Sequence, residues 1–147
     1  MWVVVCGLML CGSGLAQENG VWRAASTSAK SITGDVQFSG EKLYINYSGF
    51  IIAQLHSLSP SEAAAVFDAD SNAPVIGNVY RTDIPATKKF LHHNQLCGSE
   101  DTQYIVTYVN GHELQMAFFS GAAMPTLTAE ALTSSQNLCG TFVYERE

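Results

Sequence analysis

Positive charge is scarce in this chain of 147 residues, which has 7 Lys and Arg against 13 Asp and Glu. The formal net charge of −6 gives no general attraction to phosphate, so nucleic acids and anionic membrane surfaces are not expected as partners. Low-complexity tracts and linkers are also missing. Because 47% of the residues are hydrophobic, the chain can bury a core, and its length fits one domain.

Signature motifs of catalysis are missing too. The chain has no nucleophile elbow, phosphate-binding loop, HExxH or paired CxxC, so the sequence predicts no cofactor and no metal site. His92 and His93 are adjacent, and adjacent side chains point apart, so they rarely share one metal without further ligands. A hydrolase could use His92 or His93 as base, Asp83 or Asp101 as orienting group and a Ser or Thr hydroxyl as nucleophile.

The longest apolar run, residues 2–11, stands at the N-terminus and carries no charge. It is too short to cross a bilayer, which takes about 20 helical residues. It is typical of a secretory signal, with Gly14 and Ala16 at positions −3 and −1 of a cleavage site. We therefore predict a signal peptide over residues 1–16 and a single exported globular domain over 17–147. The domain would be periplasmic or secreted, without stable membrane insertion; a buried N-terminal strand is the alternative.

Cleavage after Ala16 would remove Cys6 and Cys11 and leave Cys97 and Cys139. An even pair in an oxidising compartment predicts one disulfide, Cys97–Cys139. A reactive thiol or a metal site are the alternatives, although two cysteines so far apart form no chelating motif.

Alternating apolar and polar residues predict a mainly antiparallel sheet. The predicted strands are 36–38, 43–47, 50–55, 75–80, 141–144 and the two arms of 102–119. The first three form a meander with turns at Ser39–Gly40 and Ser48–Gly49, and the almost continuously apolar third strand is placed centrally. The arms of 102–119 flank Asn110–Gly111, which favours a type I′ hairpin.

Short helices are expected beside the sheet. Ser59, Pro60 and Glu62 match a capping box and predict a helix over 60–67. Thr128 caps a second predicted helix over 129–133, and 86–93 could form one or two further turns. The loop with Asp68, Asp70 and Asn72 is similar to the start of a calcium loop, but it lacks the glycine and glutamate of an EF-hand and is interpreted as solvated.

These elements predict an α+β fold, mainly antiparallel β. About seven strands would curl toward a small barrel, with two or three short helices and one disulfide. Arg81, after a predicted strand, is expected to pair with Asp83 or to bind a carboxylate.

Several segments resemble a family of small exported bacterial domains that has no assigned activity. They are 32–35, 90–91, 96–98, 107–111, 117–121 and 138–142. The resemblance spans most of the mature chain and supplies no functional residues. The hairpin and the closing segment 139–142 also resemble the small barrel inhibitors of bacterial metalloproteases.

The function expected from these observations is a non-catalytic exported binding or interaction domain. It would offer loops or a barrel mouth to an unknown protein or small-molecule ligand, because function on such scaffolds lies on loops. The alternatives are a small periplasmic hydrolase using His92 or His93, and an envelope assembly or structural subunit.

Overall fold

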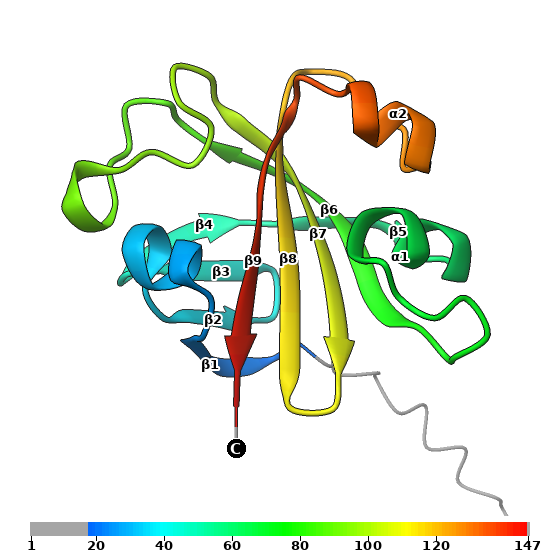
Figure 1. The fold of residues 1–147 in the computed structure, drawn as a ribbon. Coiled ribbons are helices and arrows are strands. Elements are labelled where there is room, and N and C mark those ends of the chain that lie inside the picture. Colours follow the sequence, from blue (N-terminus) through cyan, green and yellow to red (C-terminus); the bar gives the residue numbers. More distant parts are fainter. Residues whose placement is uncertain (1–17, 147) are drawn as a thin grey trace, which may run out of the picture.

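Nine strands form one antiparallel sheet in the computed structural model, which describes residues 18–146 (Figure 1). The sheet order is β4-β3-β2-β1-β9-β8-β7-β6-β5. The strands are β1 (Gly20–Ala24), β2 (Val36–Ser39), β3 (Lys42–Ile45), β4 (Ser48–Ile51), β5 (Ala53–Ser57), β6 (Ile76–Ile84), β7 (Thr102–Asn110), β8 (Glu113–Ser120) and β9 (Leu138–Glu145). The predicted signal peptide, residues 1–16, lies outside the described residues. The prediction of a mainly antiparallel sheet is confirmed.

The sheet is curled but open, so the predicted seven-strand barrel is wrong. Its two edge strands, β4 and β5, are consecutive in sequence and meet at Ile52, which is buried. The Ile51 carbonyl accepts a hydrogen bond from Thr82 Oγ1 on β6 at 2.9 Å. The Ile52 amide donates to the Glu41 carbonyl at 2.8 Å. The chain thus crosses from one edge of the sheet to the other, and the two edges approach without joining in one ladder.

The predicted number of strands, about seven, is too low for two reasons. The segment 50–55, predicted as one central strand, is split at Ile52 between the two edge strands. Its apolar residues do not share one environment, because Ile51 is 72% exposed and Ile52 is 2% exposed. The sequence reading also omitted β1, which pairs with β2 and, over two residues, with β9.

Three hairpin turns differ from the predicted ones by one or two residues. The β2–β3 turn is Gly40–Glu41, because Ser39 pairs with Lys42. The β3–β4 turn is Asn46–Tyr47, both with positive φ as type I′ requires, while Ser48 and Gly49 belong to β4. The β7–β8 turn is Gly111–His112, because Asn110 still pairs with Glu113. Type I′ requires positive φ at both central residues, but here only Gly111 (63°) has it and His112 does not, so the turn is of type II′ and not of the predicted type I′.

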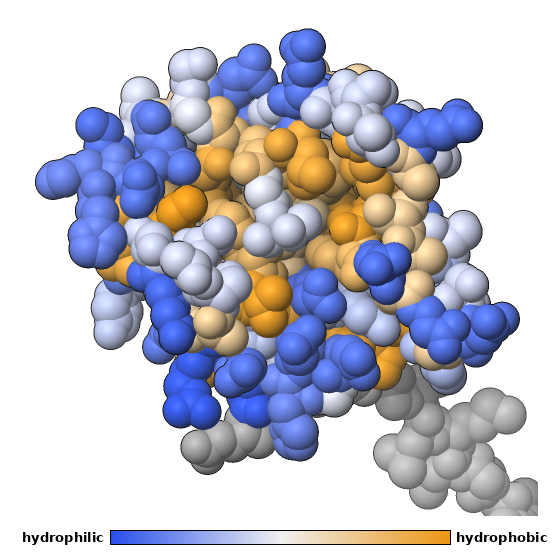
Figure 2. All heavy atoms as spheres, viewed as in Figure 1, coloured by the Kyte–Doolittle hydropathy of each residue, from blue (hydrophilic) through white to orange (hydrophobic). Residues whose placement is uncertain are grey.

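The curled sheet separates two hydrophobic clusters. The inner cluster fills the concave side with large buried side chains that include Trp22, Leu43, Phe118 and Tyr144. The outer cluster lies on the opposite face of β6, β7 and β8, under α1 (Pro60–Phe67) and α2 (Ala129–Ser134). Both predicted helices are therefore confirmed. Figure 2 shows apolar residues in the middle of the face seen, with hydrophilic residues around the rim.

The side of the molecule away from these helices carries two short helical turns, η1 (Ala29–Thr33) and η2 (Leu91–His93), which pack together (Figure 1). Of the predicted turns over 86–93, only η2 forms. Among residues 18–146, none of the helices has the length and apolar character needed to cross a bilayer.

The disulfide Cys97–Cys139 is present, as predicted. It fastens the loop 85–101 between β6 and β7 onto β9, which contains Cys139. Both cysteines are partly buried and pack against the inner cluster. The loop is thus held to the sheet by a covalent bond as well as by packing.

Replacing both cysteines by serine should lower the free energy of unfolding by about 4 kcal/mol, because the bridge closes a loop of 42 residues in the unfolded chain. Denaturant titration of the variant and of the wild type measures the loss, and titration of the wild type with reductant should show a similar one. Intact mass after alkylation supplies the control: two reactive thiols in unreduced protein would contradict the bridge.

Candidate functional site

The predicted residues His92 and His93 lie at the exposed tip of the loop 85–101. Phe90 and Leu96 anchor this loop in the inner cluster, each 7% exposed. Both histidines have positive φ, 54° and 62°, which is uncommon outside glycine. The base of the loop is therefore fixed by packing in the inner cluster, and both imidazole rings are exposed to solvent at its tip.

The hydrolase set is not brought together around these histidines. Asp101 Oδ1 accepts a hydrogen bond from the Ala86 amide at 2.8 Å and so closes the neck of the loop. In the described part of the chain, neither His92 nor His93 makes a side-chain hydrogen bond to a carboxylate or a hydroxyl. The hydrolase hypothesis stays a prediction without a contact that supports it.

Two further candidates from the sequence have other surroundings in the structure. Arg81 donates to the hydroxyl of Tyr104 at 3.0 Å and lies over its ring, instead of pairing with Asp83. In the loop after α1, the Asp70 carboxylate accepts from the Asn72 amide. Across residues 18–146, no three His, Cys, Asp or Glu side chains gather as a metal site would need.

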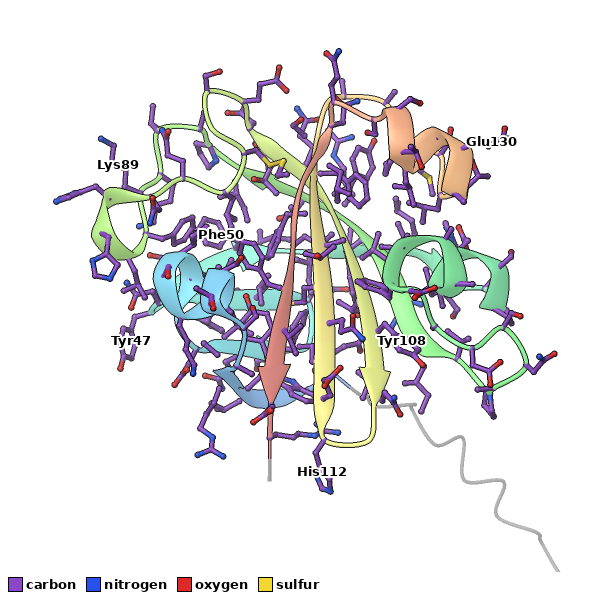
Figure 3. The ribbon with its side chains drawn as sticks, viewed as in Figure 1. Tyr47, Phe50, Lys89, Tyr108, His112 and Glu130 are labelled. Carbon is purple, nitrogen blue, oxygen red and sulfur yellow. A yellow bond between two sulfur atoms is a disulfide. The ribbon has the colours of Figure 1, made fainter. Side chains whose placement is uncertain are left out.

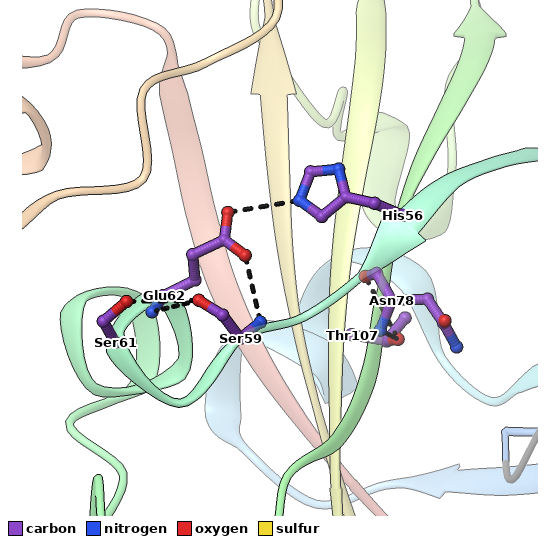
Figure 4. A network of polar contacts seen from close by, with 6 residues as sticks. All are labelled: His56, Ser59, Ser61, Glu62, Asn78 and Thr107. Carbon is purple, nitrogen blue, oxygen red and sulfur yellow. Dashed lines mark hydrogen bonds and ion pairs between the residues drawn. The ribbon is translucent and has the colours of Figure 1, made fainter.

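The sequence reading missed a pair between His56 on β5 and Glu62 on α1 (Figure 4). His56 Nε2 lies 3.2 Å from Glu62 Oε2, and Glu62 Oε1 accepts from the Ser59 amide at 3.0 Å. The Ser59 hydroxyl in turn accepts from the Glu62 amide at 3.2 Å and contacts Ser61. No hydroxyl in this network contacts His56. The pair therefore links β5 to α1 and does not have the arrangement of a catalytic dyad.

Burial alone would raise the pKa of Glu62. The hydrogen bonds from Ser59 and His56, with the charge of His56, outweigh burial and lower that pKa below its ordinary value. The folded state therefore favours the ionised carboxylate. Its contribution to stability is present above the ordinary pKa of Glu and is lost as the pH falls through the lowered pKa.

Glu62→Gln should cost about 0.5 kcal/mol at neutral pH, because the pair is partly exposed. As the pH falls below neutral, the free energy of unfolding of this variant should also decrease less steeply than that of the wild type. The measurement is the free energy of unfolding between about pH 6 and pH 3. Glu130→Gln, in the first turn of α2, is the matched control and should keep the wild-type slope; equal slopes for Glu62→Gln and wild type would contradict the assignment.

A second polar group missed by the sequence reading is Glu18, which is fully buried. Its Oε1 accepts from Asn78 Nδ2 at 2.7 Å and from Thr107 Oγ1 at 2.5 Å, while its Oε2 has no hydrogen-bond partner among residues 18–146. Its carbonyl accepts from Trp22 Nε1 at 2.7 Å. Burial, and then the charge of Glu18, raise the pKa of Tyr80 above its ordinary value. Glu18 thus ties the start of the described chain to β6 and β7.

Glu18→Ala should lower the free energy of unfolding by about 1–3 kcal/mol, because it removes the acceptor for the buried Thr107 hydroxyl and for the half-buried Asn78 amide. Glu18→Gln should cost less, since its amide oxygen still accepts from both. Chemical denaturation of the two variants compares them. Equal losses would show that the acceptor role is wrong.

The outward face of β1 to β4 is not covered by either helix, unlike the outward face of β6 to β8. In register across these strands, Val21 lies beside Gln37, Gln37 beside Tyr44, and Tyr44 beside Gly49. Paired residues point to the same side of a sheet. We call this surface the open face; it consists of the outward side chains Val21, Gln37, Lys42, Tyr44 and Ile51, with Tyr47 from the β3–β4 turn.

The open face carries the three most exposed large hydrophobic residues among those described. Val21 is 58%, Ile51 72% and Tyr47 98% exposed. Tyr47 points outward on the same side of the molecule as Lys89 of the loop 85–101 (Figure 3). The two segments meet inside the fold, where the rings of Phe50 and Phe90 pack edge to face at 6.1 Å.

A hollow of about 530 Å³ lies on the open face. Its lining includes Val21, Asp35, Gln37, Tyr44, Asn46 and Tyr47. The volume is within the range of small-molecule sites, roughly 300–1,000 Å³. None of these residues was among the candidates from the sequence; the exposed Tyr at a turn was the signal, and it was hidden because the turn was placed at Ser48–Gly49.

Comparison of the chain with protein-family models, with curated proteins and with solved structures found no match in any of the three. The resemblances described above therefore stay predictions.

Proposed function

We propose that this protein is an exported, non-catalytic binding domain that holds its ligand or partner on the open face. Apolar side chains that gather on one exposed sheet face are typical of interaction surfaces. The disulfide is compatible with an oxidising compartment outside the cytosol. The interior of the curled sheet is filled by side chains such as Trp22 and Phe118, which favours an outer surface over the barrel mouth.

The observation that carries the proposal is the conformation of Tyr47. A bulky aromatic residue with φ of 68° is a steric outlier, and Asn-Gly is the preferred pair for such a turn. A left-handed residue other than glycine costs about 1–2 kcal/mol. A ring that is 98% exposed makes little packing contribution to offset that cost. Strain kept without a folding benefit supports a role in binding, and Tyr is enriched among residues that dominate interfaces.

The test uses Tyr47→Gly, which removes the ring and supplies the residue that the turn prefers. It should raise the free energy of unfolding by about 0.5–1 kcal/mol and at the same time abolish binding. Binding is measured as retention of envelope components on the immobilised full-length domain, wild type against variant. Met124→Ala, at an exposed hydrophobic position on the loop before α2, is the matched control and should retain everything that the wild type retains.

A Tyr47→Gly domain that is more stable but loses specific components would support the proposal. Retention of the same components by wild type and Tyr47→Gly would overturn it. Retention of nothing by the wild type beyond what an inert carrier holds would overturn it as well.

A further inference from the structure

We infer that the hollow on the open face binds a neutral saccharide, an inference that rests on the proposed binding function and names its ligand class. Saccharides present apolar C–H faces and hydroxyl groups that both donate and accept hydrogen bonds. A site for them needs aromatic faces and uncharged polar groups in one depression. The hollow contains both.

The aromatic part consists of Tyr44 and Tyr47. Tyr44 lies over Gly49 of the neighbouring strand, where a Cβ atom would come within 3.0 Å of its ring. Glycine at this position therefore lets the ring rest against the strand backbone. Tyr47 stands on a rigid two-residue turn beside it. Both rings belong to the β3–β4 hairpin and line the same hollow, where they give an apolar surface on which sugar rings can pack.

The polar part consists of Gln37, Asn46 and Asp35. Within the described residues, the side chains of Gln37 and Asn46 make no hydrogen bond, so each amide has a donor and an acceptor available for a ligand. The carboxylate of Asp35 is held in place by its hydrogen bond with the Ala24 amide at 2.9 Å through Oδ1. Adjacent hydroxyls on a sugar ring suit such paired donors and acceptors.

The charge of the residues that line the hollow favours a neutral saccharide over an anionic one. Among the described residues that line the hollow, Asp35 carries the one formal charge, and that charge is negative. A phosphate or a uronic acid in the hollow would therefore be repelled by this carboxylate. The lining thus fits an uncharged sugar and disfavours anionic ligands.

The experiment titrates the full domain with maltotetraose, cellotetraose and chitotetraose as neutral probes, and with tetragalacturonic acid as the anionic probe. Isothermal titration calorimetry gives the affinities. At least one neutral probe should bind, and the anionic probe should bind at least tenfold more weakly. Binding of the anionic probe alone would overturn the inference.

Variants locate the binding. Tyr44→Ala and Gln37→Ala should each lower the affinity for the neutral probe at least tenfold. Tyr44→Phe, which keeps the ring, should change this affinity less than threefold. Asp35→Asn, which keeps an oxygen for the Ala24 amide, should reduce the difference in affinity between the neutral and the anionic probes. Met124→Ala is again the matched control. Binding that survives Tyr44→Ala lies elsewhere and contradicts the site.

The two proposals fail separately. If no saccharide binds while Tyr47→Gly still loses envelope components that the wild type retains, the saccharide inference is wrong and the binding function stands. If no saccharide binds and the wild type retains nothing specific, both are wrong.

Discussion

The passage of the chain through Ile52 is the constraint on which the rest of the structure depends. Residues before it pair at one edge of the sheet and residues after it pair at the other. Nine strands can satisfy this only if the sheet curls until its edges approach. Burial of Ile52 and the bond from Thr82 to the Ile51 carbonyl hold the crossing in place. The concave interior, with its large aromatic side chains, follows from that curvature.

The curled sheet encloses one interior, but its outward surface has two halves with different surroundings. The half built from β6 to β8 is covered by α1 and α2 and forms a second apolar cluster, in which Phe67 stacks on Tyr108. The half built from β1 to β4 has no such cover, yet it still carries exposed apolar residues. An uncovered apolar surface has a free-energy cost in water that a partner or ligand can relieve.

Most of the positive-φ residues other than glycine lie away from the two helices. Among the described residues, four of the five form two adjacent pairs, Asn46–Tyr47 and His92–His93, and the fifth, Asp68, follows the end of α1. The first pair is supported by a paired hairpin and the second by the disulfide and the buried Phe90 and Leu96. A rigid scaffold can hold such conformations because the cost of releasing them would be paid in lost packing elsewhere. The stability of the inner cluster and of the cross-link is thus what permits unfavourable geometry at the exposed tips.

Local chemistry was enough to predict some of this structure. The capping box of Ser59 and Glu62 predicted α1 to the residue, because its signal lies within four positions of the chain. The disulfide followed from the even count of cysteines left after the predicted cleavage. The hairpins were located but their turns were misplaced, since the turn position depends on cross-strand register, and register depends on which side chains the two partners bury together.

Three features could only be decided by tertiary structure. Apolar residues at 50–55 look alike in sequence, but the bend at Ile52 buries one neighbour and exposes another. No local pattern in the sequence indicates that Glu18 is buried, because the hydrogen-bond partners that hold it, Asn78 and Thr107, belong to β6 and β7. The open face exists because the cross-strand register of β1 to β3 aligns Val21, Gln37 and Tyr44 in one row while both helices pack against other strands. Sequence alone determined the local elements, which depend on neighbours along the chain, and the disulfide, which follows from the even count of cysteines. The open face depended on the register between strands, which is set by neighbours in space.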